Sequence, residues 1–135
     1  MKTMEIPVYS NITHGILNSI IGYEEIPKRW TKTAEYFGLQ VHDDSMAPEI
    51  AHNDILIIRS VDHANSGDIV LVSVNGELPI CRKILYTEFG IRLVVFNSKY
   101  ATHFYSSEDL KRMYIQVIGR VQRIIRYYNG AGYEI

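Results

Sequence analysis

The sequence predicts a mainly β fold, a domain of short, twisted antiparallel strands. Short segments rich in Val, Ile, Tyr or Phe and bounded by Gly, Asn, Asp or Pro are typical of strands, and they occur at residues 6–9, 36–42, 54–59, 68–74, 80–86, 91–96 and 115–128. Asn75-Gly76 lies between two of these segments, and both residues tolerate the positive φ of a type I′ hairpin turn. Glu88-Phe89-Gly90 predicts a second hairpin. Helix signals are limited to a single turn at 107–112, capped by Ser106 or Ser107.

The chain has the length of one compact domain with its own core. It contains 135 residues, 47% of them hydrophobic. Residues 1–30 are the least regular part, and we interpret them as an arm. Residues 31–128 form the predicted domain, and we expect the tail at 129–135 to be frayed.

Composition excludes several classes of function. Fourteen Lys and Arg against fifteen Asp and Glu give a net charge of −1, whereas a domain that binds nucleic acid through phosphates normally carries a basic excess. The single cysteine, Cys81, is consistent with a reducing compartment. Apolar runs are shorter than the roughly 18 residues that span a bilayer, and the start lacks a signal peptide, so we expect a cytoplasmic protein with no membrane contact. The histidines show no zinc-ligand spacing, and we expect no metal and no cofactor.

The loop Asp44-Ser45-Met46-Ala47-Pro48 contains the strongest candidate functional residue. Proline fixes its own φ and biases Ala47 towards an extended conformation, so this loop is stiff and can aim the Ser45 hydroxyl. Taken alone, a serine in such a turn is more often a cap or turn residue than a nucleophile. A basic partner for it would come from the strand at 80–85, which contains Arg82 and Lys83.

A series of motifs extends this loop over almost the whole chain. The series comprises the Ser45 loop, Asn53-Asp54, residues 55–58, 67–70 and 75–77, the basic strand, and Asn97-Ser98-Lys99-Tyr100. In order and spacing it resembles the C-terminal domain of LexA and phage CI-type repressors, the self-cleaving Ser-Lys peptidases of family S24. Residues 6–15 resemble the cleavage-site segment of that family.

The resemblance implies a β-rich LexA/signal-peptidase-like fold with a cleavage-loop arm and a catalytic serine, Ser45. In the family the serine attacks the chain's own peptide bond, and a lysine whose pKa is lowered by burial takes its proton. The matching bond here is His14-Gly15. The residues expected to support the loop are Asp44, Met46 and Pro48. Implied partners are a second copy, bound through strand 115–128, and a RecA-type activator. DNA binding would belong to a separate N-terminal helix-turn-helix domain, which does not precede residue 1.

Three positions depart from the family pattern. Arg82 falls at the lysine position and Lys83 where the family usually has arginine. An arginine stays protonated in proteins and cannot act as a general base. A slide of one residue would bring Lys83 into the site, but it would turn every neighbouring side chain to the opposite sheet face, so we predict Arg82 at this position. His14 is bulkier than the residue the family cleaves after, and Asp43 replaces a usual glycine.

Three hypotheses follow from these residues. The first is the regulatory and dimerisation domain of a prophage or LexA-type repressor whose autoproteolysis site is impaired by Arg82. The alternative is an active autopeptidase in which Ser45 is the nucleophile and Lys83 the base, cutting between His14 and Gly15. The third is a relative of signal peptidases, which share a Ser-Met-x-Pro loop; the absence of a membrane anchor argues against it.

Overall fold

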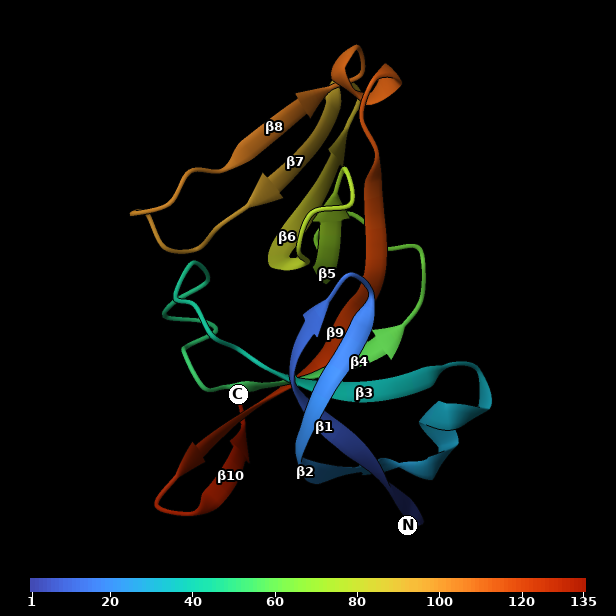
Figure 1. Ribbon diagram of the computed structural model, residues 1–135, viewed down its shortest axis with the longest axis vertical. Helices are drawn as coiled ribbons and strands as arrows, with labels where there is room; N and C mark the ends of the chain where they lie inside the picture. Colours follow the sequence, from blue (N-terminus) through green and yellow to red (C-terminus); the bar gives the residue numbers. More distant parts are fainter.

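The computed structural model describes all 135 residues and confirms a mainly β fold (Figure 1). The strands are β1 (Thr3–Thr13), β2 (Ile16–Pro27), β3 (Glu35–Gln40), β4 (Ile55–Ser60), β5 (Ile69–Val74), β6 (Ile80–Thr87), β7 (Gly90–Val94), β8 (His103–Ser106), β9 (Ile115–Tyr128) and β10 (Ala131–Glu134). Two 3₁₀ turns, η1 (Lys28–Lys32) and η2 (Asp109–Lys111), complete it. None of the helical segments has the length and apolar character needed to cross a membrane.

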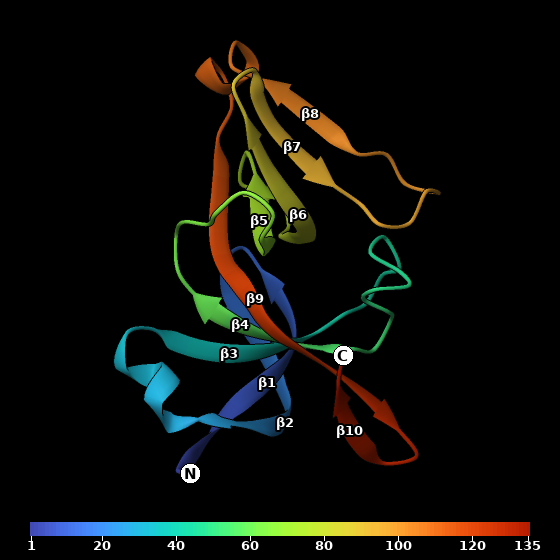
Figure 2. The ribbon, with the colours of Figure 1, turned by 180° about the vertical axis from the view of Figure 1, so that it is seen from behind.

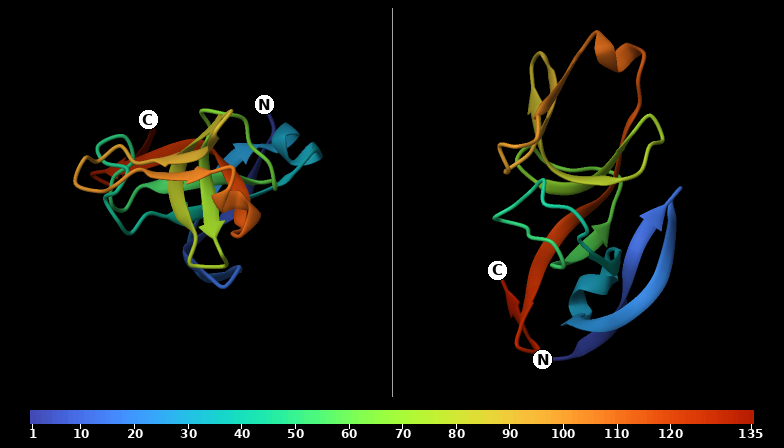
Figure 3. Two further views of the ribbon diagram at one scale, coloured as in Figure 1. Left: turned by 90° about the horizontal axis from the view of Figure 1, so that it is seen from above. Right: turned by 60° about the vertical axis from the view of Figure 1, so that its left-hand side comes forward.

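The strands form one sheet in the order β2-β1-β3-β4-β9-β5-β6-β7-β8, and β10 pairs with the far end of β9. Every pairing is antiparallel except that of β1 with β3. Strand β9 runs along the length of the molecule and joins the half built on β3 and β4 to the half built on β5 to β8 (Figures 1 and 2). The β1–β2 hairpin projects on one side (Figure 3).

The close approach of β9 to β4 depends on one glycine, Gly119. Register shifts occur where β9 pairs with β4, between Ile57 and Ile58, and where it pairs with β5, between Leu71 and Val72. Gly119 pairs with Leu71 at the second of these shifts, and an added Cβ there would be 2.4 Å from Ile58 Cγ2 and 2.7 Å from the Arg59 carbonyl oxygen. Only a residue without a side chain fits this close approach of two strands.

Three buried clusters form the core. The first joins the arm to β3, β4 and β9, and includes Ile6, Val8, Ile26 and Ile57. The second lies under the loop that follows β3 and includes Leu39, Met46, Ile50, Leu56 and Leu71. The third packs β5, β6, β7 and β9 together through Val70, Val72, Ile84, Leu93 and Val117. The loop that carries Ser45 is therefore part of the core packing.

The predicted turns are confirmed. Asn75 and Gly76 have φ of 52° and 74°, as a type I′ turn requires. A second hairpin joins β6 to β7, where Thr87 pairs with Gly90. The helical signal at 107–112 yields only the short turn η2, in which the Ser106 hydroxyl accepts a hydrogen bond of 3.0 Å from the Asp109 amide.

Two regions are more regular than the sequence predicted. The arm is a β-hairpin paired from Thr3–Pro27 to Thr13–Ile16, and its turn is made by His14 and Gly15, with φ of 49° and 77°. The tail is also ordered, because β10 pairs with β9 after a turn at Asn129 and Gly130, with φ of 51° and 80°. In both regions a residue-plus-glycine pair at positive φ reverses the chain and lets the flanking residues complete a ladder. The expectations of an irregular arm and a frayed tail were wrong for this reason.

Candidate functional site

Ser45 lies in the loop between β3 and β4, at residues 41–54, and its position is fixed by buried neighbours. Met46 and Ile50 are 2% and 0% exposed and pack into the second core cluster. Inside the loop the Ile50 amide donates to the Met46 carbonyl at 2.9 Å, and the Ala47 amide donates to the Asp44 carbonyl at 3.0 Å. The Ala47–Pro48 peptide bond is cis. Ser45 itself is only 2% exposed, so its hydroxyl is held in a water-poor position.

The Ser45 hydroxyl has two partners. It accepts a hydrogen bond of 2.8 Å from Arg82 Nη1 and donates one of 2.9 Å to Asp43 Oδ1. The same carboxylate oxygen accepts the Ser45 amide at 3.1 Å. A carboxylate that binds the amide two residues further on forms an Asx turn. The hydroxyl is therefore fixed between a cation and an anion.

Arg82 supplies the cation from strand β6. Its side chain is buried, with 9% exposure, and its Nη1 also donates to the Cys81 carbonyl at 2.7 Å. The Nε atom is buried without a hydrogen-bond partner. A guanidinium keeps all its protons in proteins, so this neighbour can donate hydrogen bonds to Ser45 but cannot remove its proton.

Lys83 lies on the other face of β6, because successive side chains of a strand alternate. Its cross-strand neighbours are Ile69 and Val94. No hydrogen bond or ion pair joins Lys83 to Ser45. The structure thus brings Arg82, and not Lys83, against the serine.

The segment between β7 and β8 closes over the Ser45 loop. The Asn97 amide donates to the Ser45 carbonyl at 3.0 Å, and Asn97 Nδ2 donates to the Asp44 carbonyl at 3.0 Å. The Tyr100 hydroxyl donates to the Asp44 carboxylate, and this hydrogen bond is the main cause that raises the pKa of Tyr100. Asp44 is thus held by contacts from another part of the chain.

Cys81 borders the site, and its thiol is unreactive. Burial raises the pKa of its thiol to about 12, the nearby Arg82 opposes this shift, and Asp43 adds to it. The reactive thiolate form is therefore disfavoured.

The arm passes the site, but its tip lies elsewhere. Residues 11–13 share a cavity of about 280 Å³ with Asp43 and Cys81, among others, and His42 Nε2 is hydrogen bonded to the Ser10 carbonyl. The tip residues His14 and Gly15 instead line a cavity of about 870 Å³ whose wall includes neither Ser45 nor Arg82. The serine and the predicted scissile bond are not brought together in this arrangement.

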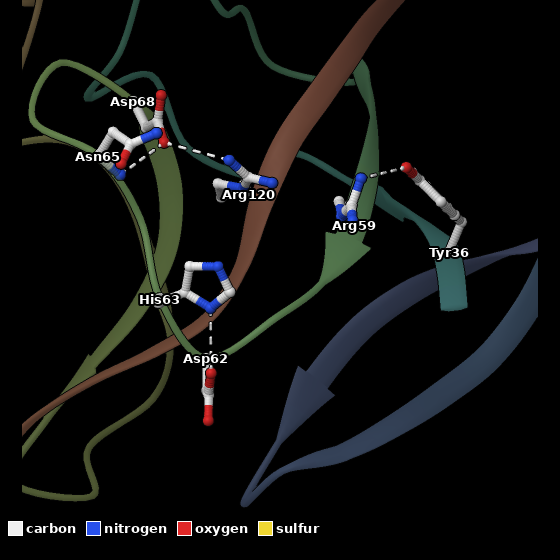
Figure 4. A network of polar contacts seen from close by, with 7 residues as sticks. All are labelled: Tyr36, Arg59, Asp62, His63, Asn65, Asp68 and Arg120. Carbon is white, nitrogen blue, oxygen red and sulfur yellow. Dashed lines mark hydrogen bonds and ion pairs between the residues drawn. The ribbon is translucent and has the colours of Figure 1, made fainter. Parts of the chain in front are cut away.

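The loop after β4 forms part of the wall at the arm tip and is held by polar contacts (Figure 4). Asp68 accepts the Asn65 amide at 2.9 Å and pairs with Arg120 at 3.8 Å. His63 contacts Asp62 at 3.3 Å. No group of three or more His, Cys, Asp or Glu side chains is arranged to hold a metal ion.

Sequence reasoning missed three residues of the site. In the sequence Asp43 stands out only as a departure from the family pattern, although an Asp two positions before a serine is a signal for an Asx turn. Asn97 and Tyr100 were recognised as part of a motif without a role. Their contacts to Asp44 span 53 and 56 positions, and no local pattern predicts contacts of that range.

Comparison with known proteins identifies the family of the chain. A family model described as Peptidase S24-like matches residues 7–122. The LexA repressor of Carboxydothermus hydrogenoformans is 29% identical over 133 residues, covering 94% of this chain and 62% of that protein. The LexA repressor of Pseudothermotoga lettingae is 31% identical over 135 residues, covering 94% of this chain and 64% of that protein.

A third LexA repressor, from Pelagibacter ubique, is 29% identical over 116 residues, covering 82% of this chain and 52% of that protein. The chain therefore spans between about half and two thirds of the length of these relatives. The family model covers most of the chain and includes both the Ser45 loop and strand β6. On these grounds the chain belongs to the Peptidase S24-like family and is a LexA-type S24 domain.

Proposed function

We propose that this chain is the cytoplasmic regulatory and dimerisation domain of a LexA-type or prophage repressor, with an autoproteolysis site that has lost its base. The relatives are named LexA repressors, which supports the repressor context. The hydrogen bond of 2.8 Å from Arg82 to Ser45 is the observation that carries the proposal.

The chemistry of a Ser-Lys pair explains why this contact matters. A neutral amine accepts the serine proton as the hydroxyl attacks, which requires a lysine that can lose its own proton. Arginine does not lose a proton in the accessible pH range. Asp43 does accept the Ser45 hydrogen bond, but carboxylates have an ordinary pKa of about 4 and are far weaker bases than an amine. Ser45 is thus held without a group that activates it.

Dimer formation is the second part of the proposal. Tyr127, Tyr128 and Tyr133, on β9 and β10, are 49%, 70% and 57% exposed. Strand β10 pairs only with β9, so its other edge is unpaired. Unpaired strand edges with exposed aromatic side chains favour association. We assign the interface between two copies to these C-terminal strands. Recognition of DNA falls to a separate helix-turn-helix domain, and a RecA-type activator is a candidate partner.

Intact mass spectrometry tests the site. The chain and its Ser45→Ala variant are incubated for a day at pH 7 and at about pH 10, where a lysine amine is more often neutral. We expect both to remain whole at both pH values. A cut between His14 and Gly15 that requires Ser45 would overturn the proposal and establish an active autopeptidase; loss of that cut in Lys83→Ala would then identify Lys83 as the base.

Sedimentation velocity tests the dimer. We expect the chain to sediment as a dimer at tens of micromolar, and Tyr133→Asp to shift it to the monomer because a charge enters the apolar contact. Tyr86→Asp is the matched control, since Tyr86 is 41% exposed but lies on β6. A monomeric chain, or equal effects of the two variants, would contradict dimerisation through the C-terminal strands.

A further inference from the structure

A basic pocket lies where η1 meets the start of β1. Its cationic side chains are Lys2, Lys28, Arg29 and Lys32, and with Met1 and Thr31 they line a cavity of about 460 Å³. No carboxylate lines this cavity. None of these four residues takes part in an ion pair, and all four are exposed. We call this feature the η1 pocket.

Local geometry gathers the charges on one side. The Lys28 amide donates to the Lys2 carbonyl at 3.1 Å, which joins the turn to β1. The Thr31 hydroxyl donates to the Lys28 carbonyl at 2.7 Å and tightens the turn. Side chains three residues apart eclipse one another in a 3₁₀ helix, so Arg29 and Lys32 point the same way.

Trp30 fixes the turn against the body of the protein. Its ring packs on the first core cluster, with the Tyr36 ring 5.5 Å away. On the ring lies the Arg123 guanidinium, whose Cζ is 4.7 Å from the centroid. Because Trp30 is anchored within this five-residue turn, the charged residues Arg29 and Lys32 on the same turn face solvent. The backbone that carries these charges is therefore fixed before binding, which lowers the entropic cost of binding.

Such a cluster calls for an anionic partner. Like charges held close together repel one another, and neutralisation by an anion removes that cost. Lysine contacts phosphate as a point charge and arginine as a planar fork, so the pocket has both common phosphate donors. The net charge of −1 argues against tight binding of an anionic partner by the chain as a whole. The charge of this one surface is different, because four of the 14 Lys and Arg residues gather there.

We propose that the η1 pocket binds phosphates of the duplex DNA backbone, as a contact independent of base sequence. The choice of DNA rests on the proposed repressor function. Such a contact adds to the affinity of a separate DNA-binding domain and contributes no sequence specificity.

The salt dependence of binding gives the expected magnitude. Each neutralised phosphate contributes about −0.9 to the slope of log affinity against log salt. Three or four contacts give a slope of about −3, so affinity falls about 40- to 150-fold between 50 and 200 mM salt.

Fluorescence anisotropy with a labelled duplex of about 20 base pairs and arbitrary sequence tests the proposal on the whole chain. The variant Lys28→Glu/Lys32→Glu should bind at least 10-fold more weakly at 50 mM salt and have a slope smaller by about 2, since two phosphate contacts are lost. The control Lys99→Glu/Lys111→Glu makes the same charge change outside the pocket and should retain the slope of the unmodified chain. Thermal unfolding of each variant confirms that it is folded.

Two results would overturn the proposal: no binding by the unmodified chain at 50 mM salt, or equal losses in the two double variants. Neither result affects the proposed function, because intact mass and sedimentation report on the Ser45 site and on the C-terminal strands. An η1 variant that loses DNA while remaining an uncut dimer separates the two proposals.

Discussion

The ion pair between Asp54 and Arg126 ties the end of the Ser45 loop to β9, and Arg126→Ala should destabilise the fold by about 2–3 kcal/mol. Asp54 is 2% exposed. Its two carboxylate oxygens accept bonds of 2.9 Å from Arg126 Nε and Nη2, and Oδ2 also accepts the Ala51 amide at 2.7 Å. Removing the arginine leaves the buried Asp54 carboxylate with only one of its three hydrogen-bond donors, the Ala51 amide.

The magnitude follows from the exposure of the two partners. Loss of one partner from a fully buried pair costs roughly 3–5 kcal/mol. The Arg126 side chain is 40% exposed, so water reaches the pair and the cost falls below that range. For comparison, Arg120 lies 3.8 Å from Asp68, and both side chains are accessible, at 25% and 32%. Arg120→Ala should therefore cost less than about 1 kcal/mol.

Urea denaturation followed by tyrosine and tryptophan fluorescence measures both variants. With a slope of about 1.5 kcal/mol per molar urea, typical of a small domain, Arg126→Ala should lower the midpoint by about 1.5 M. Arg120→Ala is the control, because it removes the same residue type from the same strand. If the two variants lose the same free energy of unfolding, Asp54 and Arg126 do not anchor the loop.

Three further predictions test other parts of the structure. With a pKa of about 12, the folded Cys81 thiol should react with iodoacetamide at pH 8 about a thousandfold more slowly than the unfolded chain, because the thiolate fraction falls in that proportion; equal rates would contradict its burial. Gly119→Val should destabilise by at least about 1–3 kcal/mol in the same urea assay, because its side chain meets β4, whereas the open position Gly22→Val, with no atom within 4 Å of its added Cβ, should change little. Asn97→Ala should speed amide exchange in residues 43–47 about fivefold, which corresponds to about 1 kcal/mol for its lost hydrogen bond; unchanged exchange would show that Asn97 does not hold the loop.

The sequence predicted most of the fold because its signals are local. Alternating apolar residues and turn pairs such as Asn75-Gly76 act within a few positions, and they predicted every strand of residues 31–128 except β8. The same turn chemistry at His14-Gly15 and Asn129-Gly130 makes the arm hairpin and β10, which the sequence prediction did not include. Strand β2 has few core positions and reads as irregular, because half of its residues are exposed and only two are buried.

The candidate site was predictable in part. The Ser45 loop and the choice of Arg82 over Lys83 followed from a motif and from strand alternation. The contacts from Asn97 and Tyr100 depend on how β7 and β8 fold back over the loop, which is a property of the whole sheet. The position of the arm tip was likewise not predictable, because a hairpin of that length can lie on the sheet in several ways, and its place depends on long-range contacts such as the packing of Ile6, Val8 and Ile26 and the pairing of β1 with β3.

The most direct test of the central claim compares the unmodified chain with Arg82→Lys/Lys83→Arg, which restores the residue order of the family, by intact mass at about pH 10. The account predicts that the unmodified chain stays whole, and that any cleavage gained by the exchanged variant is lost when Ser45→Ala is added. Cleavage of the unmodified chain that requires Ser45 would contradict the claim that Arg82 leaves the serine without a base.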